Sequence, residues 1–375
     1  MIRTLNSPTL SVYIRNIQTL VPPNTYDQEF SRDKMIDWIG DAKSSRLVKK
    51  IYDHTEIRSR HSVLPDFLST EEPVLFEGSG TPIATTAKRN AVFQSHARTM
   101  SVSVAQQVVE STKGVNFSDI THIITVSCTG FYNPGPDFDI INELGLNRAV
   151  QRYNLGFMGC NAAFPALRMA SQFCTADEDA LVLIVCIELC SLHVQVDRSK
   201  DRMLANALFS DGVAAVLVSA KSPSAGEASL EMVSFSSALL DEGQDDMAWT
   251  IGDQGFDLKL SSYVPKIIGS KIKDLISKKL NALGCHEDKI DHWAIHPGGR
   301  SILDKICKEL ALDESQVKES REVLRDYGNM SSATILFVLR KLLDSRTTKE
   351  SKVCSLVFGP GLTVDTILMN LITSS

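Results

Sequence analysis

The same succession of elements occurs twice in this 375-residue chain. In the first half an apolar strand ends in a turn at Gly130, and Cys160 begins a helix 30 residues later. In the second half a strand ends at Gly298, and Asn329 begins a helix 31 residues later. Both helices lead into another apolar strand. We therefore predict two α/β halves related by a pseudo-twofold axis, with Cys160 and Asn329 at equivalent positions beside a shared cavity.

The most apolar strand of the first half predicts how the halves are layered. Residues 180–187 form a continuous apolar run, typical of a strand covered on both faces. The small, polar segment 221–227 separates the two patterned regions. We predict one half at 1–225, carrying Cys160, and a second at 226–375.

The bulk composition excludes several classes of protein. A net charge of -6 argues against a nucleic-acid-binding surface, which is normally basic. The eight cysteines include no C-x-x-C pair, and the histidines show no zinc-like spacing with them, so we expect a reducing cytoplasm and no metal. The sequence has neither a signal-like start nor 18 consecutive apolar residues, so we expect neither secretion nor a membrane span.

Cys160 lies between a small-residue turn and an apolar helix. Pro165 is tolerated only in the first turn of a helix, so the helix begins within a few residues of Cys160. Unpaired N–H groups and the positive end of the helix dipole favour a thiolate there. The alternative is an inert, buried structural cysteine.

Two further segments favour a reactive cysteine. His296 follows an apolar strand at the entry to a Gly-rich turn, and Asn329 precedes another apolar helix. Cys, His and Asn can together supply a nucleophile, its proton acceptor and an oxyanion-stabilising donor. Papain-like proteases use the same order, and His296 follows Cys160 by 136 residues. Cys160 is nevertheless deep in the chain, and the protease signature around the cysteine is absent.

Five motifs in order resemble the type III polyketide synthases, the chalcone-synthase-like branch of the thiolase superfamily, and in the 128–137 segment the microbial members in particular. These motifs are Gly159-Cys160, Ala207–Gly212, Ala294–Gly299, Tyr327–Ala333 and Phe358–Val364.

The resemblance implies a thiolase-like fold, with two pseudo-twofold-related αβαβα halves in five layers, and a homodimer. It also implies that Cys160 carries an acyl-CoA starter as a thioester. His296 and Asn329 would then stabilise the enolate formed when malonyl-CoA loses carbon dioxide. Repeated condensation followed by cyclisation would give an alkylpyrone, resorcinol or phloroglucinol-type product. The substrates are CoA thioesters, and no further cofactor is implied.

The resemblance also implies the cavity wall. Phe209 matches an aromatic gatekeeper, and Leu258 falls where plant members carry a second one, for which Phe256 is a possible substitute. Small residues at Cys128 and Cys190 favour room for an aliphatic starter, although Asn133 and Trp249 could narrow the same space. Asn133 lies in the loop that reaches across the dimer interface in this family. The remaining cavity residues are Thr129, His193, Ser331, Gly359 and Pro360.

Positive charge is needed locally to bind CoA phosphates in an acidic chain. The residues assigned to CoA are Lys50, Arg58, Arg60, Gly298, Gly299 and Arg300. The alternative for the early basic cluster is a solvated helix face.

Two other functions share the same features. One is a single-turn ketoacyl synthase III, which has the same fold and the same Cys, His and Asn. The other is a non-catalytic acyl-CoA-binding scaffold, against which the intact set of three residues argues. Cys128 could also act as a second thiol, although no motif for a base accompanies it.

Overall fold

The structure, a computed structural model, describes residues 10–66, 74–77, 80–244, 246–261, 263–345 and 350–374. The main strands are β1 (Tyr13–Leu20), β6 (His122–Ser127), β7 (Gln151–Gly156), β8 (Leu181–Leu189), β9 (Asp211–Ser219), β10 (Ala228–Leu239), β13 (His292–Ile295), β14 (Ser351–Gly359) and β15 (Thr363–Thr373). They form one mixed sheet in the order β13-β14-β15-β10-β1-β9-β8-β6-β7.

The strand order contains the repeat that the sequence predicts. β6 runs parallel to β8, which pairs antiparallel with β9, and β9 pairs antiparallel with β1. β13, β14, β15 and β10 follow each other with the same directions. Among the described strands, the two half-sheets are joined where β1 meets β10, in the pairs Tyr13↔Glu231 and Ile14↔Leu230, and the Met232 N–H donates to Val12 O beside them. β7 is an additional strand at the edge of the first half.

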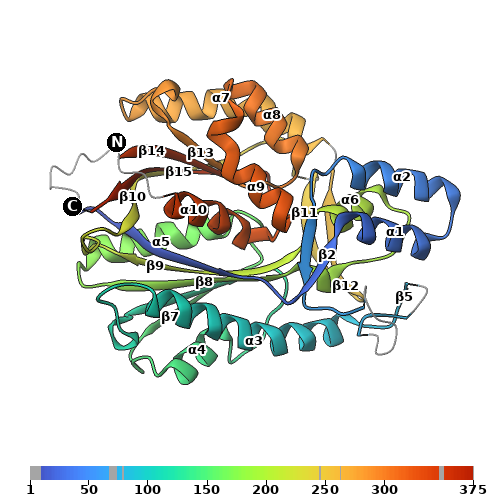
Figure 1. Ribbon diagram of the computed structural model, residues 1–375, viewed down its shortest axis with the longest axis horizontal. Coiled ribbons are helices and arrows are strands. Elements are labelled where there is room, and N and C mark those ends of the chain that lie inside the picture. The colour runs from blue at the N-terminus through green and yellow to red at the C-terminus, as the bar shows by residue number, and fades with distance from the viewer. Residues whose placement is uncertain are drawn as a thin grey trace.

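Helices cover both half-sheets and fill the space between them. The helices are α3 (Thr86–Glu110), α4 (Pro136–Leu144), α5 (Ala163–Ala176), α7 (Val264–Ala282), α8 (Arg300–Leu310), α9 (Lys318–Tyr327) and α10 (Thr334–Asp344). Figure 1 shows α7 and α8 on one outside, α3 and α4 on the other, and α5 and α10 between the half-sheets. This arrangement confirms the five-layer αβαβα prediction. In the described segments, no helix is long and apolar enough to cross a bilayer.

Alternation along the strands explains why both faces of each half-sheet are buried. In β8, Val182, Ile184 and Cys186 belong to the central core with α5 and α10. The intervening Leu183 and Val185 belong to the outer core with α3. Since successive side chains point to opposite faces, an apolar run without polar interruptions is required here.

The two central helices begin at the same end of the molecule. α5 begins at Ala163, so Pro165 occupies its first turn as predicted. α10 begins at Thr334, directly after the 3₁₀ turn Ser331–Ala333. Cys160 and Asn329 each lie just before one of these helices, and both line the same cavity.

Smaller elements gather at this end. They comprise β2 (Asn24–Asp27), α1 (Gln28–Ile39), α2 (Ala42–Asp53), β3 (Ser59–Ser62), α6 (Lys200–Leu208), β11 (Met247–Gly252) and β12 (Gly255–Leu260). β11 and β12 form a separate hairpin that packs beside α6. In Figure 1 they lie at one end of the layers, together with α1 and α2.

Replacing Leu167 by Ala is expected to destabilise the fold. Leu167 is fully buried on α5 in the central core, and such a truncation costs about 2–5 kcal/mol. Denaturant unfolding followed by circular dichroism measures the loss. Leu283→Ala is the control, because this side chain is 40% exposed and its loss is expected to cost at most about 0.5 kcal/mol. Equal losses for the two variants would contradict this description of the core.

Candidate active site

Cys160 lies in a tight turn between β7 and α5. The preceding Gly159 has a φ of 86°, and a Cβ atom there would lie 2.2 Å from Cδ of Pro360. This close approach requires glycine. The turn that carries the thiol therefore packs against the loop after β14, which belongs to the other half. Cys160 is partly exposed, in contrast with the other cysteines, which are all buried.

His296 follows the last residue of β13, where its N–H donates to Leu356 O at 2.8 Å. The side chain is 1% exposed, and neither Nδ1 nor Nε2 has a hydrogen-bond partner among the described residues. A buried imidazole without a partner is uncommon, because its desolvation is not compensated. The ring faces the cavity described below and is therefore free to bind a ligand atom.

The Asn329 side chain has a fixed orientation. Its Oδ1 accepts hydrogen bonds from the Ser331 N–H at 2.9 Å and from Thr334 Oγ1 at 3.3 Å. The Nδ2 group consequently points the other way, with Gly298 O at 3.4 Å as a weak partner. Asn329 thus presents an N–H donor to the cavity.

The three residues line one cavity of about 60 Å³. Cys160 comes from the first half of the chain, whereas His296 and Asn329 come from the second. The other lining residues are Cys128, Thr129, Gly159, Cys190, Phe209, Met247, Trp249, Leu258, Leu260, Gly298, Ile302, Ser331, Phe358 and Pro360. The volume is small beside the roughly 300–1,000 Å³ of a typical ligand pocket.

Three residues assigned to the cavity from the sequence do not line it. Gly359 lies behind the wall, where a Cβ atom would lie 1.9 Å from Asn161 Oδ1. His193 is buried beneath the β11–β12 hairpin, with both ring nitrogens hydrogen-bonded. Asn133 lines a separate cleft of about 510 Å³ together with Tyr132 and Arg152. Cys128, Cys190 and Trp249 line the same cavity, and the Trp249 Nε1–H donates to Cys128 O at 2.7 Å.

Burial controls the charge state of the catalytic candidates. It raises the pKa of the Cys160 thiol to about 12, against the opposing effect of hydrogen bonds from Ser331 and Asn329. It lowers the pKa of His296 to about 3. The free protein therefore favours a neutral thiol and a neutral imidazole over a thiolate paired with an imidazolium.

Glu188 is a buried acidic residue beside the cavity that the sequence analysis did not identify. It is the only charged residue of β8, and it lies fully buried behind the cavity. Its carboxylate accepts hydrogen bonds from the Cys128 N–H at 3.1 Å, from Thr129 Oγ1 at 3.0 Å and from Ser332 Oγ. Burial raises its pKa to about 7, although these bonds oppose the shift. An acidic residue within an otherwise apolar strand was the signal available in the sequence.

A second cleft, of about 450 Å³, adjoins the cavity and shares Leu260, Gly298 and Ile302 with it. Lys50, His54 and Arg300 line this cleft, whereas none of the described residues that line it is acidic. Gly298 and Gly299, which the sequence analysis assigns to CoA, also line it. In a chain with a net charge of -6, this cleft favours an anionic ligand.

Arg58 and Arg60, also assigned to CoA, do not line this cleft. Arg58 is exposed and pairs with Asp326 at 2.9 Å. Arg60 lies over the Tyr52 ring, and its Nη1 donates to the backbone oxygens of Asn206 and Phe209. Its position supports the backbone of the expected gatekeeper. Lys50 and Arg300 line the cleft and these two arginines do not, so position favours the former pair, although Arg300 also pairs with Glu56 and Asp304, each at 3.2 Å.

Family models match nearly the whole chain. The model of the N-terminal domain of chalcone and stilbene synthases matches residues 11–222, and that of the C-terminal domain matches 231–373. The chain belongs to the chalcone and stilbene synthase family. It is a type III polyketide synthase, an enzyme of the acyltransferase class. The resemblance noted in the sequence is therefore confirmed, and the family supports neither the single-turn synthase nor the scaffold.

Individual relatives agree with the family. The chain is 31% identical to "Probable polyketide synthase 1" of Dictyostelium discoideum, over 93% of its own length but only 11% of that protein. It is 28% identical to the "Alpha-pyrone synthesis polyketide synthase-like Pks18" of Mycobacterium tuberculosis, over 97% of this chain and 92% of that one. The crystal structure of PKS-I from the brown alga Ectocarpus siliculosus superposes with a TM-score of 0.91 at 28% identity, covering 98% of this chain and all of that one.

Among the residues described, no three His, Cys, Asp or Glu side chains are grouped so that they could hold a metal ion.

The raised pKa of Glu188 predicts a pH-dependent stability. The folded protein holds this proton up to about pH 7, whereas an ordinary glutamic acid releases it near pH 4.5. The free energy of unfolding should therefore fall as the pH rises between these values, by on the order of 3 kcal/mol from this group. Glu188→Gln removes the effect, so relative to wild type the variant should gain stability from pH 5 to pH 8. Thermal melts across this range test it, and parallel pH profiles would contradict it.

Proposed function

We propose that this enzyme loads an acyl group from an acyl-CoA onto Cys160 and extends it by decarboxylative condensation with malonyl-CoA. The observation that carries the proposal is the convergence of Cys160, His296 and Asn329 on one cavity beside a cleft with positive charge. Cys160 comes from the first half, whereas His296 and Asn329 come from the second. None of these three side chains is charged in the free protein.

Loading would begin with proton transfer from the thiol. His296 accepts the proton while Sγ of Cys160 attacks the thioester carbon, and the CoA sulfur leaves as the C–S bond to Cys160 forms. The hydrogen bonds from Ser331 and Asn329, together with the first turn of α5, favour the transient thiolate. The unpaired His296 ring can then return its proton to the leaving sulfur.

Condensation would use the same donors a second time. N–H groups of His296 and Asn329 bind the thioester oxygen of malonyl-CoA and stabilise the enolate left when carbon dioxide departs. The enolate carbon attacks the carbonyl of the Cys160 thioester, and the Cys160 sulfur leaves. The product is longer by two carbons and can be loaded again. This chemistry requires hydrogen-bond donors but no redox cofactor.

The released product class follows from the relatives and from the cavity. The name of the mycobacterial relative refers to alpha-pyrone synthesis, which supports a pyrone, with resorcinol and phloroglucinol-type products as alternatives. A free cavity of about 60 Å³ favours short starters and few extensions unless its wall moves.

We also infer a cytoplasmic homodimer. Phe131, Phe138 and Met158 are large apolar side chains that are each about two-fifths exposed (37%, 37% and 41%). Phe131 and Phe138 flank the 132–137 loop, in which Asn133 lies outside its own chain's cavity. Exposed apolar side chains of this size on both sides of the loop favour a contact with a partner there, which supports the expectation that Asn133 reaches the cavity of that partner.

The two chemical steps should be separable by mutation. Incubation with malonyl-CoA and a series of starters from acetyl-CoA to palmitoyl-CoA, read by mass spectrometry, tests the whole reaction. Cys160→Ala should abolish loading and all polyketide products but retain release of carbon dioxide from malonyl-CoA. Asn329→Leu should lower both activities by roughly 10²–10³-fold, as for the loss of one oxyanion donor. Products from Cys160→Ala, or a diketide alone from wild type, would refute the proposal.

The lining of the cleft predicts which positively charged side chains bind CoA. Lys50→Ala and Arg300→Ala should each raise KM for malonyl-CoA, and the difference from wild type should shrink at high salt because the charges are exposed. Arg58→Ala is the matched control, since Arg58 is equally basic but lies outside the cleft. A rise in KM for Arg58→Ala with none for Lys50→Ala would reverse this assignment.

A further inference from the structure

The β11–β12 hairpin forms one wall of the cavity without belonging to the main sheet. It is a two-stranded sheet in which Met247 pairs with Leu260 and Trp249 with Leu258. These four side chains share one face of the hairpin, and all of them line the cavity. Because no strand of the main sheet pairs with the hairpin, its side-chain contacts and loop contacts determine where this wall stands.

His193 provides the central attachment of the hairpin. Its Nε2 lies 2.7 Å from Thr129 O, and its Nδ1 lies 3.0 Å from the Phe256 backbone nitrogen. A carbonyl oxygen only accepts and an amide N–H only donates, so Nε2 carries the proton and Nδ1 accepts. The neutral tautomer is therefore fixed by its two partners. Burial lowers the pKa of His193 to about 3 and keeps the ring in this form.

The His193 ring also packs on the hairpin. It stacks on the Phe256 ring at 4.1 Å with an angle of 10° between the planes, and it meets the Trp249 indole edge-on at 5.6 Å. The Trp249 Nε1–H donates to Cys128 O at 2.7 Å. The hairpin is thus attached to two consecutive backbone oxygens after β6. Trp249 binds that of Cys128 directly, and His193, which contacts Trp249, binds that of Thr129.

The backbone that carries His193 is itself fixed. Arg89 of α3 is fully buried, and its Nη1 donates to Leu192 O at 2.5 Å and to Val194 O at 3.2 Å. These oxygens flank His193 on both sides. Gly255 makes the close approach possible, since a Cβ atom there would press on Arg89 and on His193 Nδ1. His193 therefore connects the backbone held by Arg89 to the hairpin wall of the cavity.

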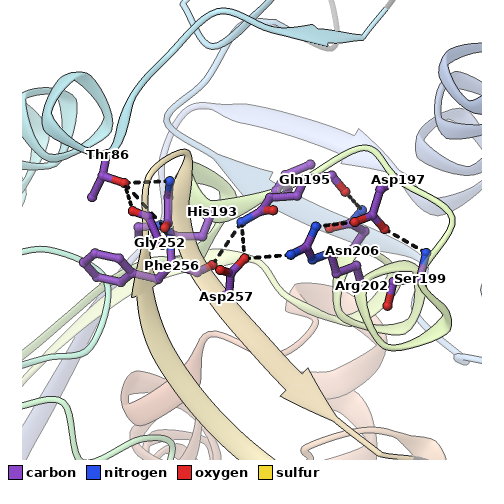
Figure 2. Close-up of polar contacts among 12 residues, drawn as sticks. Thr86, His193, Gln195, Asp197, Ser199, Arg202, Asn206, Gly252, Phe256 and Asp257 are labelled. Carbon is purple, nitrogen blue, oxygen red and sulfur yellow. Dashed lines mark hydrogen bonds and ion pairs between the residues drawn. The ribbon is translucent and has the colours of Figure 1, made fainter.

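Further contacts tie the tip of the hairpin to the body of the protein. Figure 2 shows Thr86 bonded to the tip at Gly252, while Asp257 on the next strand faces Gln195 and Arg202. Asp257 Oδ1 accepts from Gln195 Nε2 at 2.8 Å and from Arg202 Nη2 at 2.9 Å. Arg202 belongs to α6, the helix that ends at the Phe209 gatekeeper.

We propose that His193 is a positioning residue that sets which acyl chains the cavity accepts. It does so by holding Phe256, and through it Trp249, against the end of β6. His193 contacts neither the cavity nor the three catalytic candidates, so its effect reaches the reaction only through the wall. The proposal rests on the proposed function, since it concerns the size of the starter and of the growing chain.

Three substitutions test this role with the full chain and the starter series. His193→Phe keeps a ring that can stack on Phe256 but removes both hydrogen bonds. His193→Gln retains one donor and one acceptor, spaced much as the two imidazole nitrogens are, and is the rescue variant. Ser355→Ala is the matched control, because it removes a buried hydrogen bond of 2.8 Å to Ala294 O far from the hairpin.

His193→Phe should shift the product ratio toward longer starters by about tenfold, the effect of roughly one methylene of lost wall contact. His193→Gln should return the ratio toward wild type, and Ser355→Ala should leave it unchanged. Trp249→Phe, which loses the bond to Cys128 O, should shift the ratio in the same direction, and the double variant should add little. Hydrogen exchange of the 247–260 peptide should rise in His193→Phe but not in Ser355→Ala.

The outcomes separate this inference from the proposed function. A wild-type enzyme that makes no polyketide refutes the proposed function. A wild-type enzyme that makes polyketides, with the same starter profile in His193→Phe, refutes the positioning role. If His193→Phe does not fold, Trp249→Phe decides by the same measurement, and an unchanged profile there is equally negative.

Discussion

Packing α5 and α10 between the two half-sheets is the constraint on which this molecule depends. In the described strands the half-sheets meet over a short pairing of β1 with β10, so the central core around the two helices holds the halves in register. Because both helices begin at the same end, the turns before them bring Cys160 and Asn329 together. The reaction site is thus a product of how the halves pack, and neither half contains it alone.

Two buried histidines, His193 and His296, show how the same residue type can have two different roles. Burial lowers the pKa of both to about 3. His193 has partners for both ring nitrogens and holds a wall in place, whereas His296 has none and faces the cavity. Hydrogen-bond satisfaction, and not the direction of the pKa shift, distinguishes the structural histidine from the one left for a ligand.

Most of the fold, and the residues at the centre of the candidate site, could be predicted from the sequence. Repeated spacing predicted the two halves, and Pro165 and the apolar run at 180–187 predicted a helix start and a doubly covered strand. Residues at the ends of regular elements, such as Cys160, His296 and Asn329, were found because topology places those ends together. The sequence assigned Arg60 to the CoA site and His193 to the cavity wall, and the structure places both elsewhere, because their surroundings come from distant segments. Arg60 turns inward to the 206–209 backbone, and His193 lies under a hairpin more than 50 residues later.

The unpaired ring of His296 has a consequence for the free enzyme. The desolvation of this ring already lowers the stability of the folded protein. An oxygen that later hydrogen-bonds to the ring offsets that desolvation. In the proposed mechanism, discrimination between a ground-state carbonyl and a developing oxyanion therefore rests on a group that weakens the empty protein. A substitution that filled this space with a well-packed apolar side chain would stabilise the empty protein and remove the ring that faces the cavity, the trade-off between stability and activity that preorganised sites impose.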